Sequence, residues 1–428
     1  MKIHFIGIGG TAIGPLALIA KQAGYNVSGS DKQGSAYIEY LRSQGITDIY
    51  TGESREDLAE MHRQQSIDLV VHSSAVSIEN PNHPEIAFAR DNNIRTAKRD
   101  ELLNKIIKDN KLKLIAVAGT HGKTTTTAMI IWLFKHLGLP ASYSVGAKIP
   151  YGDMGHYDDH SKYFIYECDE FDRNFLAFHP YISIITGIDY DHQEQYPDIE
   201  DYRGAFRQFL GQSEHKIVWQ EDIRSSSLKA DDNLVIVDKF DDQYKILNTL
   251  SILGLVNRRD ALQAIIAVHK ITKEPLDKLA TIMNGFPGVS RRFEKITENL
   301  YSDYAHTIPK IKGCLQLSTE VSKDIVIVYE PLTNRRQYFI RDEYKTLFKD
   351  VKQLYWVPSY LAREDPAQPV ITPQEFIDRI EAPKNKEAAE LNESLKLKIR
   401  EHLQKGDIVV CLSGGGGNSL DEWLRQNF

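Results

Sequence analysis

The chain has 428 residues, 42% of them hydrophobic and 26% charged, so we expect a globular protein of two or three domains and not a disordered chain. The formal net charge of −7 offers no general attraction to nucleic acid or anionic lipid, and neither is expected as a partner. Three scattered cysteines are too few for a disulfide framework or a zinc site. The first residues show no signal-peptide pattern, and no apolar run approaches the roughly 20 residues of a membrane span. We therefore expect a cytoplasmic protein without membrane insertion, as a monomer or homodimer.

Short apolar runs alternate with helical patterns at the start of the chain. Residues 3–6 and 26–28 read as strands on either side of a helix at 14–23, and another strand is expected at 68–71. This alternation predicts a parallel sheet with helices on both faces. The lysine-rich stretch 105–113 reads as a linker to the next domain.

Two further regions follow with the same strand-and-helix character. In the second region, strands are expected at 114–118, 163–167 and 182–186, and a helix runs from the first of these to the Gly and Pro at 138–140. The breaker cluster at 286–288 opens the third region, whose strands are expected at 325–329 and 408–412. The last of these strands ends in a glycine run. These breaks predict domains at residues 1–109, 110–288 and 289–428.

The strongest local signal is the segment 119–124, GTHGKT, between a predicted strand and a predicted helix. Glycines let successive backbone N–H groups point at phosphate oxygens, and the helix N-terminus adds its positive dipole end. Lys123 can reach the β- and γ-phosphates, and the Thr124 hydroxyl can bind Mg²⁺. Only two residues separate the glycines, where the common form of this loop has four. The context nevertheless favours nucleotide phosphate binding over a chance loop.

Acidic residues and a histidine follow the next two predicted strands. Glu167 opens an acidic run after the strand at 163–167, and Asp191 and His192 come after the strand at 182–186. The carboxyl ends of neighbouring parallel strands meet at one crevice, where these groups can bind a Mg²⁺ that bridges nucleotide and acceptor. Alone, an acidic run is usually a solvated surface and a single histidine is usually structural.

A second glycine motif follows the first predicted strand. Gly7, Gly9 and Gly10 begin a G-x-G-x-x-A pattern, and Asp31 ends the second strand about twenty residues later, as in dinucleotide-binding folds. Such a loop can hold the pyrophosphate of NAD or of a UDP-sugar. Two phosphate-binding loops in one chain indicate two phosphorylated substrates, and an NAD-linked dehydrogenase has no use for the second.

With these motifs in this order, the chain resembles the Mur ligase family over nearly its whole length, and most of all its alanine-adding branch. The resemblance implies an α/β fold of three domains: an N-terminal Rossmann-like UDP-binding domain, a central P-loop ATPase-like domain and a C-terminal Rossmann-like domain. It assigns UDP-sugar binding to Gly7, Gly9, Gly10, Asp31, Ser73 and Ser74. It assigns ATP binding to Gly119, Thr120, His121, Gly122, Lys123, Thr124, Thr125, Asn257 and Arg291.

The metal and the third domain are assigned in the same way. Thr124, Glu167 and His192 would surround Mg²⁺ by this resemblance. Catalytic roles fall to Lys123, Glu167, His192, Arg291 and His306, with Arg291 approaching the ATP phosphate from a hinge. Amino-acid binding falls to Asp303, His306, Arg335 and Arg336. A capped loop is the structural alternative for Asp303 and His306.

Several positions depart from the alanine-adding pattern. Thr307 stands where a second histidine is usual, and Leu332-Thr333 stands where a His-Arg pair is usual. Arg335 or Arg336, close by in sequence, can supply the missing charge. Asp260 stands where a second asparagine is expected.

The resemblance implies a ligase reaction in cytoplasmic peptidoglycan precursor synthesis. The lactyl carboxylate of UDP-N-acetylmuramate would attack the γ-phosphorus of ATP, and the amine of L-alanine would then displace phosphate from the acyl phosphate. A murein tripeptide recycling ligase on the same UDP-sugar is one alternative. A folate polyglutamate-type ligase is another, although it would lack the preceding nucleotide-binding fold. A non-catalytic UDP-sugar- or NAD-binding protein is a third, against which the intact Lys123, Thr124, Glu167 and His192 argue.

Overall fold

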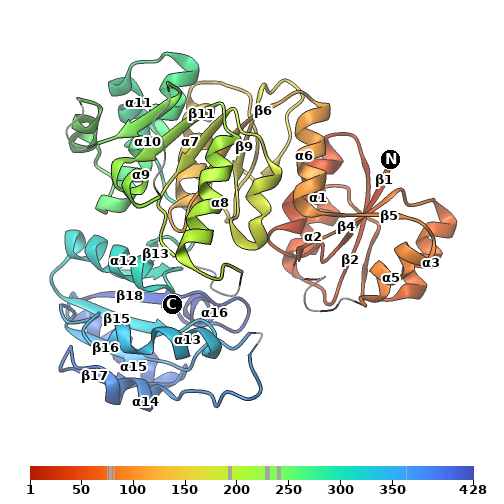
Figure 1. The fold of residues 1–428 in the computed structure, drawn as a ribbon. Helices are drawn as coiled ribbons and strands as arrows, with labels where there is room; N and C mark the ends of the chain where they lie inside the picture. Colours follow the sequence, from red (N-terminus) through yellow and green to blue (C-terminus); the bar gives the residue numbers. More distant parts are fainter. Residues whose placement is uncertain are drawn as a thin grey trace. The chain divides into compact units, whose positions relative to one another are not determined.

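Three β-sheets, each covered by helices, make up the fold (Figure 1). The computed structural model describes residues 1–74, 76, 80, 82–190, 195–226, 232–238, 242–362 and 364–428. The chain divides into two compact units. The first comprises residues 1–250 and 260–286, and the second comprises residues 251–259 and 287–428. The mixed α/β fold class predicted from the sequence is confirmed, while the three predicted domain limits stay a prediction.

The first sheet is fully parallel, with the strand order β3-β2-β1-β4-β5. Its strands are β1 (Lys2–Ile6), β2 (Asn26–Asp31), β3 (Ile49–Thr51), β4 (Leu69–His72) and β5 (Arg95–Lys98). Its helices are α1 (Ile13–Gln22), α2 (Ala36–Ser43), α3 (Arg55–Gln64), α5 (Pro84–Asp91) and α6 (Arg99–Asp109). The strand order reverses direction between β1 and β4, and ligands of open parallel sheets bind at such a point, outside the carboxyl ends of the strands.

The second sheet has seven strands in the order β12-β11-β10-β6-β9-β7-β8, with only the β7–β8 pair antiparallel. Its strands are β6 (Lys113–Ala118), β7 (Ser142–Ser144), β8 (Gly155–His156), β9 (Tyr163–Glu167), β10 (Ile182–Ile185), β11 (His215–Trp219) and β12 (Leu234–Val237). Its helices are α7 (Lys123–His136), η1 (Phe171–Ala177), α8 (Ile199–Gly211), α9 (Gln220–Ser226), η2 (Asp242–Thr249), α10 (Leu255–Thr272) and α11 (Leu276–Met283). The central strand β6 is buried from Leu114 to Ala118, as expected for a parallel strand covered on both faces.

One hydrophobic cluster joins the first two sheets. It includes Phe5 on β1, Ile106 on α6, and Ala116 and Phe164 on the second sheet, all 0% exposed. Helix α6 therefore contributes to this shared core, and the two sheets belong to one compact unit. The linker predicted at 105–113 is shorter in the structure: residues 105–109 belong to α6, residues 110–112 form the connecting turn, and Lys113 opens β6. The lysines there hid the buried apolar pair Ile106 and Ile107.

The third sheet makes up the core of the second unit, with the order β13-β14-β18-β15-β16-β17. Only the β13–β14 pair is antiparallel. Its strands are β13 (Glu294–Thr297), β14 (Leu300–Asp303), β15 (Ile325–Glu330), β16 (Gln353–Trp356), β17 (Lys386–Ala388) and β18 (Ile408–Ser413). Its helices are α12 (Ile308–Val321), α13 (Asn334–Ile340), η3 (Arg341–Tyr344), α14 (Pro373–Arg379), α15 (Glu393–Gln404) and α16 (Leu420–Asn427).

The all-apolar runs predicted as strands in this region are β15 and β18, which lie side by side at the centre of the sheet. Among the described residues, no helix combines the length and the apolar character needed to cross a bilayer.

Candidate active site

The predicted phosphate loop, residues 119–124, lies between β6 and α7. Gly119 and Gly122 have positive φ angles of +137° and +77°, which glycine adopts without steric cost. A Cβ atom on Gly119 would stand 2.5 Å from Thr186 Oγ1, so a larger residue does not fit there. Helix α7, all of whose residues are described, has no acidic residue in its first turn and no side-chain cap. Its N-terminal N–H groups and positive dipole end therefore remain directed at the loop.

The ammonium group of Lys123 is held at the base of this loop. Its Nζ donates to the carbonyl oxygen of Gly119 and to Oε2 of Glu170, both at 2.6 Å. Glu170 is 1% exposed, so this is a buried ion pair. Burial by itself would lower the pKa of Lys123, but the carboxylates of Glu170 and Asp169 raise it above its ordinary value. Lys123 is therefore a cation at neutral pH, with one of its three N–H groups left over for a ligand.

The next residue of the loop contacts the first residue of the acidic run. Thr124 Oγ1 donates to Glu167 Oε1 at 2.8 Å, and the second oxygen of Glu167 accepts from the N–H of Gly146 at 2.8 Å. A hydroxyl and a carboxylate side by side are the hard oxygen donors that Mg²⁺ prefers. The third predicted ligand, His192, lies outside the described residues. Within those residues, no group of three or more His, Cys, Asp or Glu side chains has the geometry of a metal site.

The other predicted ATP-binding residues of the loop pack against the end of β10. Thr120 Oγ1 donates to the carbonyl oxygen of Asp189 at 2.7 Å, and His121 Nε2 lies 2.9 Å from Asp189 Oδ2. The hydrogen bond with His121 lowers the pKa of Asp189 below its ordinary value. Thr125 is buried in the first turn of α7. Asp189 was not predicted, although its place directly after a buried parallel strand is a usable signal.

Asp260 and Glu170 also border the phosphate loop without having been predicted as site residues. A Cβ atom on Gly122 would stand 2.8 Å from either carboxylate oxygen of Asp260, so α10 approaches the loop closely there. Glu170 belongs to the acidic run that the sequence singled out, but only Glu167 was given a role. Both carboxylates lie next to a loop that is predicted to bind phosphate, and of the two Glu170 is the one paired with Lys123.

The N-terminal glycine loop follows β1, at the point where the strand order reverses. Gly7 has a φ of +73°, and Gly10 N–H donates back to the carbonyl oxygen of Gly7 at 3.0 Å. Asp31, at the end of β2, accepts a hydrogen bond from Gly9 N–H at 2.8 Å. The carboxylate thus occupies a donor that a phosphate oxygen or a ribose hydroxyl would otherwise engage. Its predicted contact with a ribose stays a prediction.

The carboxyl ends of β4 and β5 are linked to the acidic run of the second sheet, through Ser74 and Lys98 respectively. Lys98 Nζ lies 2.7 Å from Asp172 Oδ2. Burial would raise the pKa of Asp172, but hydrogen bonds from Lys98 and from the predicted UDP-sugar residue Ser74 lower it. The neighbouring Ser73 accepts a hydrogen bond at its carbonyl oxygen from Val76 N–H at 3.2 Å. The acidic run therefore contacts the phosphate loop through Glu170 and the first sheet through Asp172.

In the second unit, Asp303 is the last residue of β14 and His306 lies in the loop that follows it. Asp303 accepts hydrogen bonds from the N–H groups of Phe293 (2.7 Å) and Ala305 (2.8 Å), which is the geometry of a capped loop. His306 Nδ1 lies 2.7 Å from the carbonyl oxygen of Tyr304, which assigns a hydrogen to Nδ1 because a carbonyl only accepts. Burial, together with nearby Lys310 and Arg336, lowers the pKa of His306 well below its ordinary value. The imidazole is therefore neutral, with Nε2 as an acceptor.

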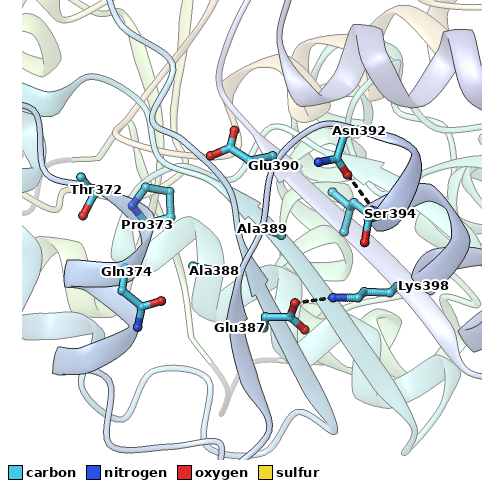
Figure 2. A pocket seen from close by; sticks show the side chains of 11 residues that line it. Thr372, Pro373, Gln374, Glu387, Ala388, Ala389, Glu390, Asn392, Ser394 and Lys398 are labelled. Carbon is cyan, nitrogen blue, oxygen red and sulfur yellow. Dashed lines mark hydrogen bonds and ion pairs between the residues drawn. The ribbon is translucent and has the colours of Figure 1, made fainter.

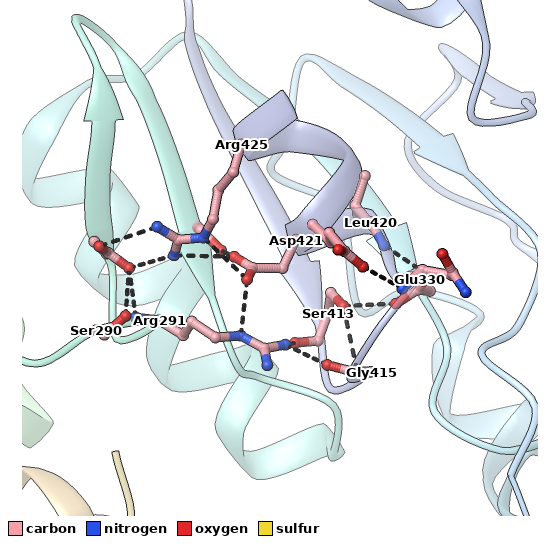
Figure 3. A network of polar contacts seen from close by, with 12 residues as sticks. Ser290, Arg291, Glu330, Ser413, Gly415, Leu420, Asp421 and Arg425 are labelled. Carbon is pink, nitrogen blue, oxygen red and sulfur yellow. Dashed lines mark hydrogen bonds and ion pairs between the residues drawn. The ribbon is translucent and has the colours of Figure 1, made fainter. Parts of the chain in front are cut away.

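Arg291 lies in a polar network at the carboxyl ends of β15 and β18 (Figure 3). Its Nη2 donates to the carbonyl oxygens of Ser413 and Gly415, both at 2.8 Å. Its Nε lies 3.4 Å from Asp421 Oδ2. The guanidinium group predicted to approach ATP thus has three partners within the second unit.

The two arginines proposed for the amino-acid carboxylate differ in their surroundings. Arg336 is half-buried and contributes to the low pKa of His306, whereas Arg335 is exposed. The backbone N–H of Arg335 donates to Glu364 Oε2 at 3.0 Å. Asn257 lies in the first turn of α10, and its Nδ2 donates to the carbonyl oxygen of Leu253 at 2.9 Å. Of the two arginines, Arg336 is thus the one close enough to His306 to influence its pKa, and the predicted carboxylate contact stays a prediction.

A separate pocket of about 440 Å³ lies at the outer edge of the third sheet, beside β17 (Figure 2). Thr372, Ala388 and Asn392 line it, together with an ion pair between Glu387 and Lys398. None of the described site residues named above lines this pocket.

Comparison with known proteins places the two glycine loops in two domains of the same protein family. Residues 2–111 match the model of the Mur ligase family catalytic domain, and residues 117–240 match the Mur ligase middle domain. The UDP-N-acetylmuramate–L-alanine ligase of Clostridium perfringens is 31% identical, over 97% of this chain and 95% of that protein. Each matched segment contains one of the loops described above.

Solved structures agree over the whole chain. The UDP-N-acetylmuramate–alanine ligase of Thermotoga maritima superposes with a TM-score of 0.74 at 26% identity, covering 97% of this chain and 96% of that one. A murein peptide ligase from Psychrobacter arcticus shares the fold, with a TM-score of 0.64 at 21% identity and the same coverage of both chains. The near-complete coverage includes the third sheet as well as the first two. This chain belongs to the Mur ligase family.

Proposed function

We propose that this chain is an ATP-dependent carboxylate–amine ligase that joins L-alanine to the lactyl carboxylate of UDP-N-acetylmuramate. The observation that carries the proposal is its similarity, over nearly the full length of both chains, to UDP-N-acetylmuramate–L-alanine ligases. The cationic phosphate loop supports it, because such a ligase must hold the phosphates of ATP. We also propose three domains, at residues 1–109, 110–288 and 289–428.

In the first step, a carboxylate oxygen of the UDP-sugar attacks the γ-phosphorus of ATP, and ADP leaves. Two anions must approach each other, and the buried cation Lys123 offsets part of their repulsion. Thr124 and Glu167, with His192, would hold Mg²⁺, which when bound would offset the negative charge of the phosphate oxygens. The N-terminal glycine loop, Gly7 to Gly10, would hold the pyrophosphate of the UDP-sugar.

In the second step, the amino group of alanine attacks the acyl carbon. The C–N bond forms as the bond from carbon to the phosphate oxygen breaks, inorganic phosphate leaves and the amine releases a proton. The neutral Nε2 of His306 accepts a hydrogen bond from the amine, which holds the nitrogen lone pair toward the carbon. Arg336 pairs with the carboxylate of the amino acid.

The test is a reconstitution with purified protein, ATP, Mg²⁺ and UDP-N-acetylmuramate. Single amino acids and the murein tripeptide are supplied in turn, and phosphate release is measured while the product is identified by mass spectrometry. We expect phosphate release that requires all substrates, with L-alanine giving the highest kcat/KM. Release with tripeptide but not with alanine would leave the ligase reaction standing and replace the amine donor. Activity without the UDP-sugar would contradict the proposal.

A further inference from the structure

Both ends of the C-terminal glycine loop, residues 414–417, are attached to one buried carboxylate. Glu330 ends β15 and is 3% exposed. It accepts hydrogen bonds from Ser413 Oγ at 2.6 Å and from the N–H of Leu420 at 2.9 Å (Figure 3). Ser413 precedes the loop and Leu420 opens α16. The distance between the two ends of the loop is therefore set by Glu330, at the end of a central strand of the sheet.

Arg291 holds the start of the same loop. The two carbonyl oxygens that its Nη2 contacts belong to Ser413 and Gly415, the residues on either side of Gly414. Asp421, in the first turn of α16, holds the other side of the guanidinium group through its ion pair with Nε. A planar guanidinium group with several fixed donors can contact the two loop carbonyls on one side and Asp421 on the other. A contact with phosphate would require these bonds to break first.

Gly414, whose two neighbours are held by Arg291, lies against the side chain of His306. A Cβ atom on Gly414 would stand 3.0 Å from Cβ, Cγ and Nδ1 of His306, so the imidazole packs directly on the glycine backbone. The orientation of the imidazole therefore depends on where Arg291 holds Gly414.

Arg291 also supports the other side of the imidazole, through Tyr304. The N–H of Tyr304 donates to the carbonyl oxygen of Arg291 at 2.8 Å, and the guanidinium carbon lies 4.8 Å from the centre of the Tyr304 ring. The carbonyl oxygen of Tyr304 is the acceptor for Nδ1–H of His306. The hydrogen bond from Tyr304 N–H is to the backbone of Arg291 and does not depend on its side chain, and the guanidinium group of Arg292 also lies over the Tyr304 ring, at 5.1 Å. The side chain of Arg291 thus acts on His306 mainly through Gly414 and shares the ring of Tyr304 with Arg292.

We infer that Arg291 is a positioning residue for His306, acting through Gly414 and Tyr304, and is not a ligand of the ATP phosphates. The inference rests on the proposed function only in taking His306 Nε2 as the group that meets the incoming amine. It assigns Arg291 to the second step of the reaction, which needs the amine, and removes it from the first step, which does not.

The two steps can be measured apart. Without an amine, reversible formation of the acyl phosphate scrambles ¹⁸O between the bridging and non-bridging positions of ATP in the presence of UDP-N-acetylmuramate. In Arg291→Gln we expect this exchange and the KM for ATP to stay within about twofold of wild type, while the KM for alanine rises about tenfold or more. A tenfold loss of exchange or a tenfold rise in the KM for ATP would overturn the inference.

A second variant changes the contact between Gly414 and His306 and leaves Arg291 in place. Gly414→Ala should reproduce the rise in the KM for alanine, because the added methyl displaces the ring of His306. Arg400→Lys, an exposed arginine on α15 of the same unit, serves as the matched control and should change neither step. An alanine KM that is normal in Gly414→Ala would contradict the inference.

A spectroscopic readout covers the case in which a variant or the wild type lacks activity. Long-range ¹H–¹⁵N correlation spectra report which imidazole nitrogen of His306 carries the hydrogen. We expect the Nδ1–H form in wild type and in Arg400→Lys, and a mixture of tautomers in Arg291→Gln and Gly414→Ala. An unchanged tautomer in both variants would overturn the inference. Wild-type protein without UDP-sugar-dependent exchange would count against the proposed function instead, and the spectra would still decide the role of Arg291.

Discussion

Two glycine-rich loops of this molecule each join a buried strand to a helix, but they differ in the first turn of that helix. The phosphate loop joins the buried strand β6 to α7, and the C-terminal glycine loop joins the buried strand β18 to α16. The first turn of α7 carries Lys123 and no acid, whereas that of α16 carries Asp421 and Glu422. One carboxylate beside the first loop, Glu170, is paired with its lysine. Beneath the second loop lies Glu330, buried and bonded to both loop ends.

The comparison shows that a strand, a glycine loop and a helix do not by themselves make a phosphate site. Backbone N–H groups and a helix dipole attract an anion only where neighbouring side chains leave the local charge favourable. Carboxylates lie beside both loops, three of them around the C-terminal loop, so the cations make the difference: Arg291 is engaged with loop carbonyls and Asp421, whereas Lys123 keeps one N–H group for a ligand. That loop instead builds the wall against which His306 packs.

The largest expected effect comes from removing the cation that distinguishes the phosphate loop. Lys123→Ala should lower kcat/KM at least about 10²- to 10³-fold, the loss usual for one group that stabilises transition-state charge. Binding of UDP-N-acetylmuramate, measured by calorimetry, should survive because its predicted residues lie on the first sheet. Near wild-type turnover would mean that Lys123 is not the phosphate lysine.

This substitution needs a control for stability. It leaves Glu170 buried without its cation, which by itself costs on the order of 3–5 kcal/mol of folding free energy. The double variant Lys123→Ala with Glu170→Gln removes the stranded charge. We expect the double variant to regain thermal stability and to remain inactive, so that activity and folding are separated.

The second expected effect concerns the metal. Glu167→Gln keeps an oxygen acceptor for Thr124 but loses the carboxylate charge. Activity should fall at least about 10- to 100-fold, the loss usual when even an outer partner of a metal ligand is removed. The Mg²⁺ concentration for half-maximal activity should rise, and excess Mg²⁺ should restore part of the rate. No such recovery is expected for Lys123→Ala, and equal Mg²⁺ curves for Glu167→Gln and wild type would argue against this ligand.

The third expected effect tests the second unit with a pair of adjacent arginines. Arg336→Ala should raise the KM for alanine about tenfold, which corresponds to about 1.4 kcal/mol. Arg335→Ala is the matched control, since that side chain is exposed, and should change this KM less than about twofold. The KM for ATP should be unaffected in both. The opposite pattern would transfer the carboxylate contact to Arg335.

The sequence predicted the backbone of this molecule better than the partners of its side chains. Apolar runs identified β6, β15 and β18, because a parallel strand covered on both faces is recognisable from composition alone. The same reasoning failed at α6, where lysines on the solvent side masked the buried face. The glycine motifs were informative because positive φ angles restrict the residue type.

Side-chain pairing was not predictable in the same way. Glu170 meets Lys123 across 47 positions, and Arg291 meets Ser413 across 122. Which of several carboxylates approaches a given cation depends on differences of an ångström in tertiary packing, and motif order carries no such information. The resemblance identified the residue types in the site, and only the structure shows which of them are already engaged.

The smallest expected effect concerns the carboxylates of the C-terminal loop, through pH. Burial would raise the pKa of Asp421, but hydrogen bonds from Arg425 and Ser302 and the charge of Arg291 lower it below its ordinary value of 3.8. A carboxyl group whose pKa is lowered by folding stabilises the protein above its ordinary pKa, and loses that contribution as the pH falls through the folded value.

Asp421→Asn should therefore reduce the free energy of unfolding of the second unit by about 1 kcal/mol at pH 7. The difference in free energy of unfolding between wild type and Asp421→Asn should become smaller as the pH falls below 3.8, because Asp421 of the wild type is then neutralised as well. Urea melts followed by tryptophan fluorescence at pH 7, 5 and 3 measure this difference, with Glu393→Gln on the exposed start of α15 as the control. If the difference in free energy of unfolding is the same at all three pH values, the charge of Asp421 does not contribute to stability and only the shape of its side chain does. Asp421 would then no longer count among the three charged carboxylates that surround the C-terminal loop.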